Sequence, residues 1–236
     1  MSRKSSGNRT FGHALDKLKK LLSADLMATD TFVRAITHRS ADGKHNERME
    51  FLGDSVLGLI ITTELYRRIP RASEGYLSRL RASLVNENAL AGLSAGLGLG
   101  DFLRLGPGEL KSGGFRRKSI LADALEALIG CIYLERGLVE AERFVLTIYG
   151  NLLHQLPTED DLKDPKSRLQ EYLQSRNYGL PEYNLVSVDG EAHRQTFTAE
   201  CLVPELAIRT TGTSSSRRKA EQEAAAKAFE KVLSNA

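Results

Sequence analysis

The sequence predicts a protein of two domains, an all-α domain followed by a small α+β domain with the order α-β-β-β-α. Three observations favour this fold class. Apolar residues recur at helical spacing through residues 1–156. A polar segment with two prolines, PTEDDLKDPKS, interrupts that pattern, and strand-like alternation appears only after it. We therefore expect the all-α domain at residues 1–156, a linker at 157–163 and the α+β domain at 164–234.

The first domain contains stretches in which apolar residues recur every three or four positions, as on one face of a helix. Glycine and proline lie between these stretches, as in IPRASEG and LGPGELKSGG, and mark the turns. The region has no strand-like alternation. The expected helical stretches are residues 9–22, 56–69, 76–99, 120–135 and 138–156.

The second domain changes from helical to strand-like patterning and back. In its central segment, apolar residues from Phe197 to Val203 alternate with polar ones, as in a half-buried strand. The last segment opens with serines that can cap a helix and then shows an alanine-rich face. The expected elements are a helix at 165–177, strands at 183–188, 194–203 and 206–212, and a helix at 214–233.

The net charge of +3 is small, but it is unevenly distributed. Residues 1–20 hold six Lys or Arg against one acid, whereas residues 164–236 hold ten of each. The overall charge therefore does not indicate a nucleic-acid-binding protein, and such a function must be argued from local clusters.

Apolar segments and cysteines bear on where the protein works. No apolar run approaches the ~20 residues of a membrane helix, so we expect no membrane partner. The basic N-terminus lacks the apolar core of a secretory signal, although a transit peptide stays open. Cys131 and Cys201 are far apart in sequence and flanked by apolar residues, which favours two buried thiols in a reducing compartment. We expect a cytoplasmic protein.

Three carboxylates lie in the apolar segment NERMEFLGDS. At ~100° per residue, Glu47, Glu50 and Asp54 fall within an arc of about 60° on one helix face. Like charges at these spacings repel, and a partly buried acid cluster needs compensation. A solvated acidic face is the alternative interpretation, but the rest of this helix is apolar for several turns. A divalent cation fits the pattern better.

A second acidic pair, Asp123 and Glu126, lies three residues apart in the apolar segment SILADALEALIG. Two buried helices with such faces can place four carboxylates around one pocket. Oxygen ligands suit Mg²⁺, with Mn²⁺ as a substitute, and such a site can hydrolyse phosphodiesters. A di-iron or di-manganese bundle would also use buried acids, but it prefers Glu-x-x-His pairs, which neither helix has.

Four segments, HNERMEFLGDSVL, THRS, SEGYLSRLRASLVN and ILADALEALIGCIYLE, resemble the bacterial ribonuclease III family. Met49 stands where the family commonly has Leu, a change that conserves volume. The resemblance covers nearly the whole chain and implies roles for six acids. It implies metal binding by Glu50, Asp123 and Glu126, the most sensitive catalytic roles for Asp54 and Glu126, and accessory roles for Glu47 and Glu74.

The same resemblance implies a homodimer in which Phe51 enters a socket on the partner subunit. From the residues alone, Phe51 is equally well an ordinary core residue. Two symmetry-related sites could cut both strands of one duplex. The implied activity is Mg²⁺-dependent cleavage of double-stranded RNA to 5′-phosphate and 3′-hydroxyl ends with short 3′ overhangs. The implied substrates are ribosomal RNA precursors and some messenger and transfer RNA precursors.

The second domain resembles a double-stranded-RNA-binding domain, which recognises the duplex largely by shape. Two departures occur: Glu191 replaces a proline in the loop after the first strand, and Ser214 replaces a glycine before the last helix. A protein that binds duplex RNA without cutting it is the rival hypothesis, which the complete set of acids disfavours. The resemblance implies RNA contacts by Gln170, Glu171, His193, Ser216, Arg217, Arg218 and Lys219.

Overall fold

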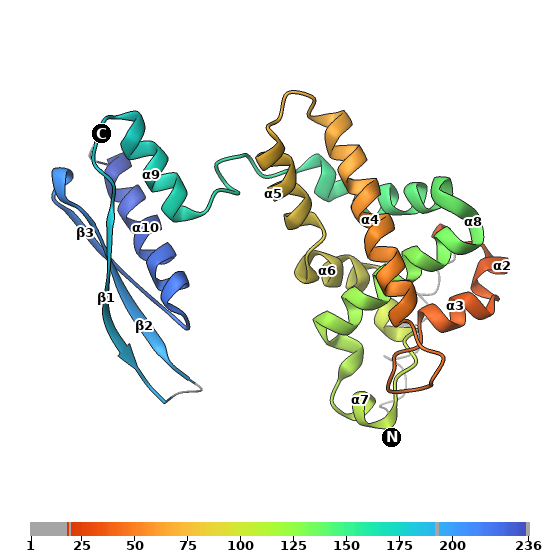
Figure 1. The fold of residues 1–236 in the computed structure, drawn as a ribbon. Coiled ribbons are helices and arrows are strands. Elements are labelled where there is room, and N and C mark those ends of the chain that lie inside the picture. Colours follow the sequence, from red (N-terminus) through yellow and green to blue (C-terminus); the bar gives the residue numbers. More distant parts are fainter. Residues whose placement is uncertain (1–17, 19, 192–193, 235–236) are drawn as a thin grey trace, which may run out of the picture. The chain divides into compact units, whose positions relative to one another are not determined.

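The computed structural model describes residue 18 and residues 20–191 and 194–234, and the chain divides into two units that meet between Leu156 and Pro157 (Figure 1). The helix expected at residues 9–22 lies mostly outside the described residues. Among the described residues, no helix has the length and apolarity that crossing a bilayer requires.

The first unit is helical in its described part, as the apolar spacing predicted. One expected helix, residues 76–99, is in fact two helices, because the Asn86 side chain accepts the backbone N–H of Ala89 and begins a new helix. Its elements are α2 (Ala24–Met27), α3 (Asp30–Ala35), α4 (Glu47–Arg68), α5 (Glu74–Leu84), α6 (Glu87–Leu97), η1 (Leu99–Asp101), α7 (Pro107–Lys111), η2 (Gly114–Arg116) and α8 (Lys118–His154).

Helix α8 carries two of the expected helical stretches and breaks between them. Gly137 has φ 79° and ψ −179°, a backbone conformation that glycine adopts without steric cost. The break between the helical stretches expected at 120–135 and 138–156 was therefore correctly predicted. Residues before the break belong to the buried half of α8, which includes Asp123 and Glu126.

Helices α4 and α8 pack in close contact at two glycines (Figure 1). A Cβ atom on Gly53 would lie 1.8 Å from the Glu126 carbonyl oxygen, and one on Gly130 would lie 2.4 Å from the Met49 carbonyl oxygen. Only residues without a side chain allow this approach. The crossing brings the N-terminal turns of α4 against the acidic pair of α8.

The second unit has the predicted order, with an antiparallel sheet in the order β1-β2-β3 and helices α9 and α10. Helix α10 packs against β2, β3 and α9, and the Tyr172 and Phe229 rings meet edge to face, 5.4 Å apart. Cys201 is buried and unpaired in this core, and Cys131 is buried and unpaired in the first unit. The elements are α9 (Pro165–Ser175), β1 (Glu182–Asp189), β2 (Thr196–Val203), η3 (Pro204–Leu206), β3 (Ile208–Ser214) and α10 (Arg217–Ser234).

Candidate functional site

Three of the predicted acids meet where α4 crosses α8. Glu50 of α4 and Asp123 and Glu126 of α8 each offer a carboxylate oxygen, and these oxygens all lie within 4.8 Å of one another. All three side chains are half-buried. The helical spacing predicted the pair on α8, while the contact at Gly53 and Gly130 supplies the proximity of Glu50. Such a set can hold one divalent cation.

Burial and mutual repulsion make this cluster costly to ionise. Burial, followed by the charges of Asp54, Glu50 and Asp123, raises the pKa of Glu126 to about 8. Burial and then the Asp123 charge raise the pKa of Glu50, and burial is also the main cause of the raised pKa of Asp123. The protein itself therefore leaves the cluster short of positive charge, which a metal ion would supply.

Asp54 lies at the edge of this cluster. It is exposed, one helical turn beyond Glu50, and its charge is the largest electrostatic contribution to the raised pKa of Glu126. It is not one of the three residues whose oxygens converge within 4.8 Å. Of the four carboxylates expected around one pocket, three thus form the tight set and Asp54 stands beside it.

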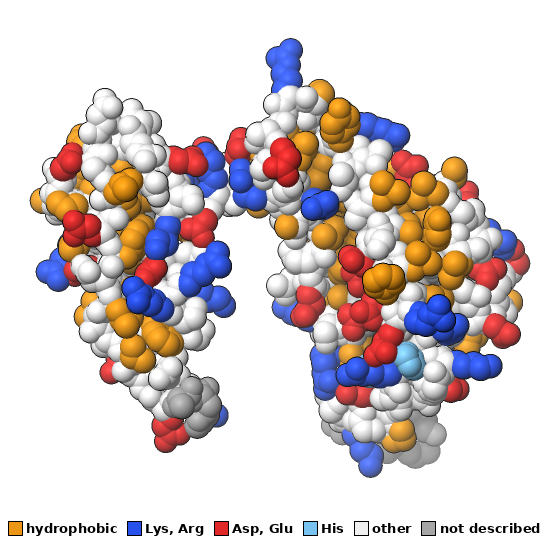
Figure 2. Space-filling view, viewed as in Figure 1, with side chains coloured by type: hydrophobic (Ala, Val, Ile, Leu, Met, Phe, Trp, Pro, Cys, Tyr) orange, Lys and Arg blue, Asp and Glu red, His pale blue; other side chains and the backbone are white. Residues whose placement is uncertain are grey.

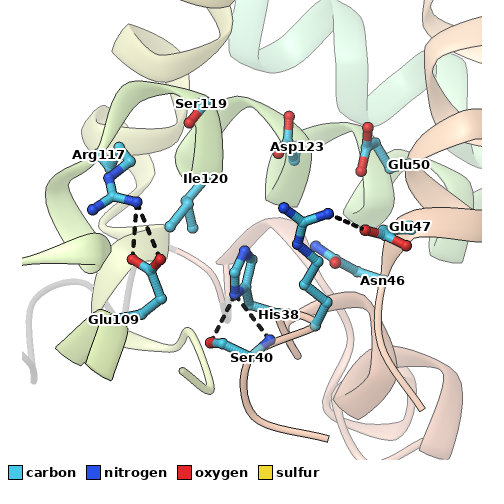
Figure 3. A pocket seen from close by; sticks show the side chains of 11 residues that line it. His38, Ser40, Asn46, Glu47, Glu50, Glu109, Arg117, Ser119, Ile120 and Asp123 are labelled. Carbon is cyan, nitrogen blue, oxygen red and sulfur yellow. Dashed lines mark hydrogen bonds and ion pairs between the residues drawn. The ribbon is translucent and has the colours of Figure 1, made fainter. Parts of the chain in front are cut away.

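A cavity of about 540 Å³ adjoins the cluster on the side of Glu50 and Asp123 (Figure 3). Glu47 lines it, with one carboxylate oxygen 3.2 Å from Arg39 Nη1 and the other 3.6 Å from His45 Nδ1. Figure 2 shows acidic side chains on one face of the first unit with basic side chains beside them. The cavity is large enough to admit part of a substrate, and both acidic and basic side chains line it.

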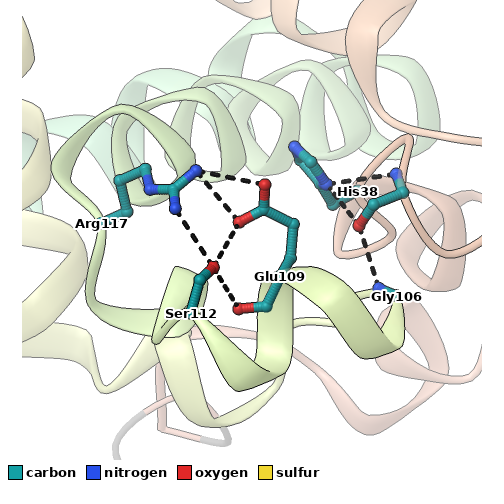
Figure 4. A network of polar contacts seen from close by, with 6 residues as sticks. His38, Gly106, Glu109, Ser112 and Arg117 are labelled. Atoms are coloured by element: carbon teal, nitrogen blue, oxygen red, sulfur yellow. Dashed lines mark hydrogen bonds and ion pairs between the residues drawn. The ribbon is translucent and has the colours of Figure 1, made fainter.

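A polar network adjoins this cavity (Figure 4). The Glu109 carboxylate lies 3.0 Å from Arg117 Nη1, and Arg117 Nη2 donates to Ser112 Oγ at 3.2 Å. His38 Nδ1 lies 2.8 Å from Ser40 Oγ. The sequence pattern did not single out Glu109, Ser112 and Arg117, although their hydrogen bonds join residues only five to eight positions apart. The polar THRS segment before α4 was the visible sign of His38 and Ser40.

Glu74 lies away from the acid cluster of its own chain. It begins α5, accepts the Ser78 hydroxyl at 2.7 Å and lines a second cavity together with Thr62 and Tyr66 of α4. Thr62 is twelve residues beyond Glu50, which corresponds to roughly 18 Å along a helix at ~1.5 Å per residue. Within one chain, Glu74 therefore does not join the other predicted acids.

Phe51 points into solvent rather than into the core of its own chain. It is 78% exposed, and Leu59 and Tyr66, further along α4, are 55% and 72% exposed. At ~100° per residue these side chains share an arc of about 80°. Figure 2 shows hydrophobic side chains gathered over α4. A stripe of exposed apolar residues on one helix is typical of an interaction surface.

The predicted RNA contacts of the second unit lie on the exposed sides of α9 and α10, except His193, which is outside the described residues. Gln170 and Glu171 are exposed on α9, and Arg217, Arg218 and Lys219 are exposed in the first turn of α10. Ser216 precedes that turn, and its Oγ accepts the backbone N–H of Lys219 at 3.4 Å.

Acidic side chains pair with these basic residues, which the sequence pattern did not reveal. The buried Glu221 carboxylate pairs with Arg217 at 2.9 Å and with Lys166 at 2.7 Å, and these hydrogen bonds lower its pKa. Glu171 pairs with Lys163 at 2.7 Å. Glu221 lies four residues after Arg217 on one helix, so helical spacing could have revealed that pair. The pair of Glu221 with Lys166 joins two helices and could not be read from spacing.

Comparisons with known proteins agree with both units. The family described as ribonuclease-III-like matches residues 29–152, and the double-stranded RNA binding motif matches residues 165–232. The chain is 52% identical over 218 residues to Ribonuclease 3 of Vibrio cholerae, covering 92% of this chain and 97% of that protein.

Two solved structures of the nuclease domain of ribonuclease III from Campylobacter jejuni resemble the first unit. One is 40% identical with a TM-score of 0.55, over 58% of this chain and 96% of that one. The other is 39% identical with a TM-score of 0.56, over 61% and 98%. The chain therefore belongs to the ribonuclease III family and is an endoribonuclease that acts on double-stranded RNA.

Proposed function

We propose that this endoribonuclease depends on Mg²⁺ and releases products with 5′-phosphate and 3′-hydroxyl ends. The observation that carries the proposal is the convergence of Glu50, Asp123 and Glu126 within 4.8 Å, beside a cavity that Glu50 and Asp123 line, in a chain that also has an RNA-binding unit. A cation between these carboxylates and an RNA phosphate would offset the repulsion between the two negative groups.

The donor set fits a hard divalent cation. Its three ligands are carboxylates, which Mg²⁺ prefers and Mn²⁺ also accepts. The raised pKa values show that burial leaves these acids under-compensated. When bound, the cation would stabilise charge on a phosphate oxygen and lower the pKa of a water molecule.

The acids of the chain have distinct proposed roles. Glu50, Asp123 and Glu126 would hold the metal, and Asp54, exposed beside Glu126, would accept a hydrogen bond from the attacking water and orient it. Water attacks phosphorus in line as the bond to the 3′ oxygen breaks. Cleavage of that bond leaves the phosphate on the 5′ end of one product and a hydroxyl on the 3′ end of the other.

Two further acids are proposed as accessory groups. Glu47 faces the cavity, where Arg39 and His45 hold its carboxylate. Glu74 lies beside Tyr66 instead of inside its own chain's cluster, so its proposed place is along the RNA strand. The two acids therefore have different surroundings, although accessory roles were expected for both.

We also propose a homodimer that cuts both strands. The exposed stripe of Phe51, Leu59 and Tyr66 supports it, and one of the Campylobacter jejuni structures is described as having a region involved in dimer formation. Two symmetry-related sites offset across a duplex would leave short 3′ overhangs.

The second unit would hold the duplex through both of its helices. Gln170 and Glu171 would reach 2′-hydroxyls in the minor groove, with His193 as a second minor-groove contact. Ser216, Arg217, Arg218 and Lys219 would bind phosphates. The proposed substrates are ribosomal RNA precursors and some messenger and transfer RNA precursors, processed in the cytoplasm.

The test incubates the full chain with end-labelled duplex RNA, with Mg²⁺ or with a chelator. Cleavage that requires Mg²⁺, and leaves a 5′-phosphate, supports the proposal. Cutting in the chelator would falsify the metal-dependent mechanism. Tight binding without cleavage in either condition would instead favour the rival hypothesis of a non-cutting RNA-binding protein.

A further inference from the structure

The segment from His38 to Ser40, which forms one wall of the cavity beside the acid cluster, has its backbone held by residues distant in sequence. The His38 N–H donates to the Arg104 carbonyl at 3.0 Å, and the Arg104 N–H donates to the Ile36 carbonyl at 2.8 Å. The Gly106 N–H donates to Ser40 Oγ at 2.9 Å. A Cβ on Gly106 would lie 2.1 Å from the Ser40 carbonyl oxygen. The segment is therefore a rigid base for the side chains it carries.

His38 presents a fixed hydrogen-bond donor from this base. Its Nδ1 accepts the backbone N–H of Ser40 at 3.2 Å and lies 2.8 Å from Ser40 Oγ. Because Nδ1 accepts, the proton of the neutral ring is on Nε2. The Nε2 edge of the ring points away from Ser40 into the cavity (Figure 3).

Arg39 is held much more loosely than the arginine on the opposite wall. Its side chain is 70% exposed and meets Glu47 through one contact of 3.2 Å. Arg117, by contrast, is bound by both Glu109 oxygens and by Ser112. Ion pairs between exposed side chains contribute little and exchange readily. The charge of Arg39 is thus available to an incoming anion, while that of Arg117 is committed.

We propose that Arg39 and His38 form a phosphate-binding subsite, which takes a phosphodiester of the duplex next to the one that is cut. This inference rests on the proposed function. The Arg39 guanidinium exchanges Glu47 for two phosphate oxygens, a geometry that its planar fork matches, and His38 Nε2–H adds a neutral donor. Because the segment is rigid, a phosphate held here fixes its neighbour at the acid cluster.

The test uses the full chain and compares Arg39→Ala with Arg48→Ala, an exposed arginine close by on the first turn of α4. Arg39→Ala should raise KM for duplex RNA roughly tenfold to a hundredfold, with a smaller change in kcat. It should also make the slope of log affinity against log salt shallower by about one, measured in a Glu126→Gln background in which cutting is strongly slowed. Arg48→Ala should change neither.

Two conservative variants separate charge from geometry. Arg39→Lys keeps the charge but loses the planar fork, so it should retain the salt dependence with an intermediate KM. His38→Asn keeps an oxygen that can accept the Ser40 N–H but lacks the Nε2 donor, so its KM should rise less than that of Arg39→Ala. A merely structural role of Arg39 would leave the salt dependence unchanged.

A substrate scan identifies the phosphate. Duplexes carry one neutral 2′-deoxy methylphosphonate at each position flanking the cut, with 2′-deoxy phosphodiesters as controls. At one position, the neutral linkage should weaken RNA binding by the wild type but should not further weaken binding by Arg39→Ala. If the wild type cuts with Mg²⁺ while Arg39→Ala keeps its KM, its salt dependence and every scan penalty, the subsite is wrong and the proposed function stands. If the wild type does not cut, the proposed function fails instead.

Discussion

The acid cluster between α4 and α8 and the basic first turn of α10 are both groups of like charge on helices, and the protein compensates them differently. In the first, burial and repulsion raise the pKa of Glu50, Asp123 and Glu126. In the second, the cations are exposed, and Glu221 pairs with both Arg217 and Lys166.

This difference separates what each region requires from outside. Arg39 compensates the charge of the acid cluster only in part, because the pKa values of Glu50 and Asp123 stay raised, so the function of the cluster should depend on metal. The basic turn is partly neutralised already and faces water, so its function should depend on salt and on duplex RNA. Changes that affect one dependence and not the other test the distinction.

The largest effect is expected from Glu126→Gln, which removes one of the three carboxylates that converge in the cluster. Cleavage should fall roughly 10²–10⁴-fold, while duplex affinity stays close to that of the wild type. Single-turnover cleavage and a gel-shift assay measure the two. Glu140→Gln, on the exposed surface beyond the break in α8, is the control. Equal losses of cutting and binding would contradict the assignment of the acid cluster to cleavage rather than to RNA binding.

Gly53→Ala should disturb the helix crossing that assembles the cluster. Its Cβ would lie 1.8 Å from a backbone oxygen of α8, so we expect about 1–3 kcal/mol of destabilisation and loss of cleavage. Gly58→Ala is the matched control, because a Cβ there meets nothing within 4 Å. Thermal unfolding and cleavage assays of both variants check this. Equal stability of the two would show that the glycine contact does not set the crossing.

Arg218→Ala in the basic turn should act through salt rather than metal. Affinity for duplex RNA should fall at physiological salt, and the slope of log affinity against log salt should become shallower by about one. The Mg²⁺ requirement for cleavage should be unchanged. Binding measured over a salt series tests this. Lys227→Ala, two turns further along α10 and paired with Glu223, serves as the control. A shifted Mg²⁺ requirement in Arg218→Ala would undermine the comparison.

The smallest expected effects are opposite responses to pH. Glu126 keeps its proton to about pH 8 in the folded chain but loses it nearer pH 4.5 when unfolded, so its contribution to stability falls as pH rises between these values. Glu221, whose pKa is lowered by Lys166 and Arg217, contributes stability above pH 4.5 that is lost on acidification.

Thermal unfolding in a chelator at several pH values separates these two groups. Glu126→Gln should stabilise the metal-free protein more at pH 8 than at pH 5, and added Mg²⁺ should reverse the wild type's loss. Glu221→Gln should destabilise it more at pH 7 than in acid. The same pH profile for both variants would contradict the opposite settings of the two carboxylates.

The sequence predicted the two-domain architecture, because helical and strand periodicity are local signals. It also placed Asp123 and Glu126 on one helix face. It did not reveal that Gly53 and Gly130 bring α4 and α8 together, since a glycine within a helix carries no sign of its partner. The division at Asn86 was readable as a helix cap and was missed.

Non-local bonds explain the rest of the gap. The segment that carries His38 and Arg39 is held by Arg104 and Gly106, more than sixty residues away. No spacing rule could therefore predict that this segment forms a wall of the cavity. The pairing of Lys166 with Glu221 is of the same kind. Such contacts decide which charges are neutralised and which remain available.

The most direct test of the central claim titrates Mg²⁺ while following single-turnover cleavage of duplex RNA by the wild type and by Asp123→Asn. We expect no cleavage without the metal. For Asp123→Asn, the Mg²⁺ concentration at half-maximal rate should rise at least about tenfold while duplex affinity is unchanged. Cleavage in a chelator, or the same half-maximal Mg²⁺ concentration for both proteins, would contradict a metal site built from Glu50, Asp123 and Glu126.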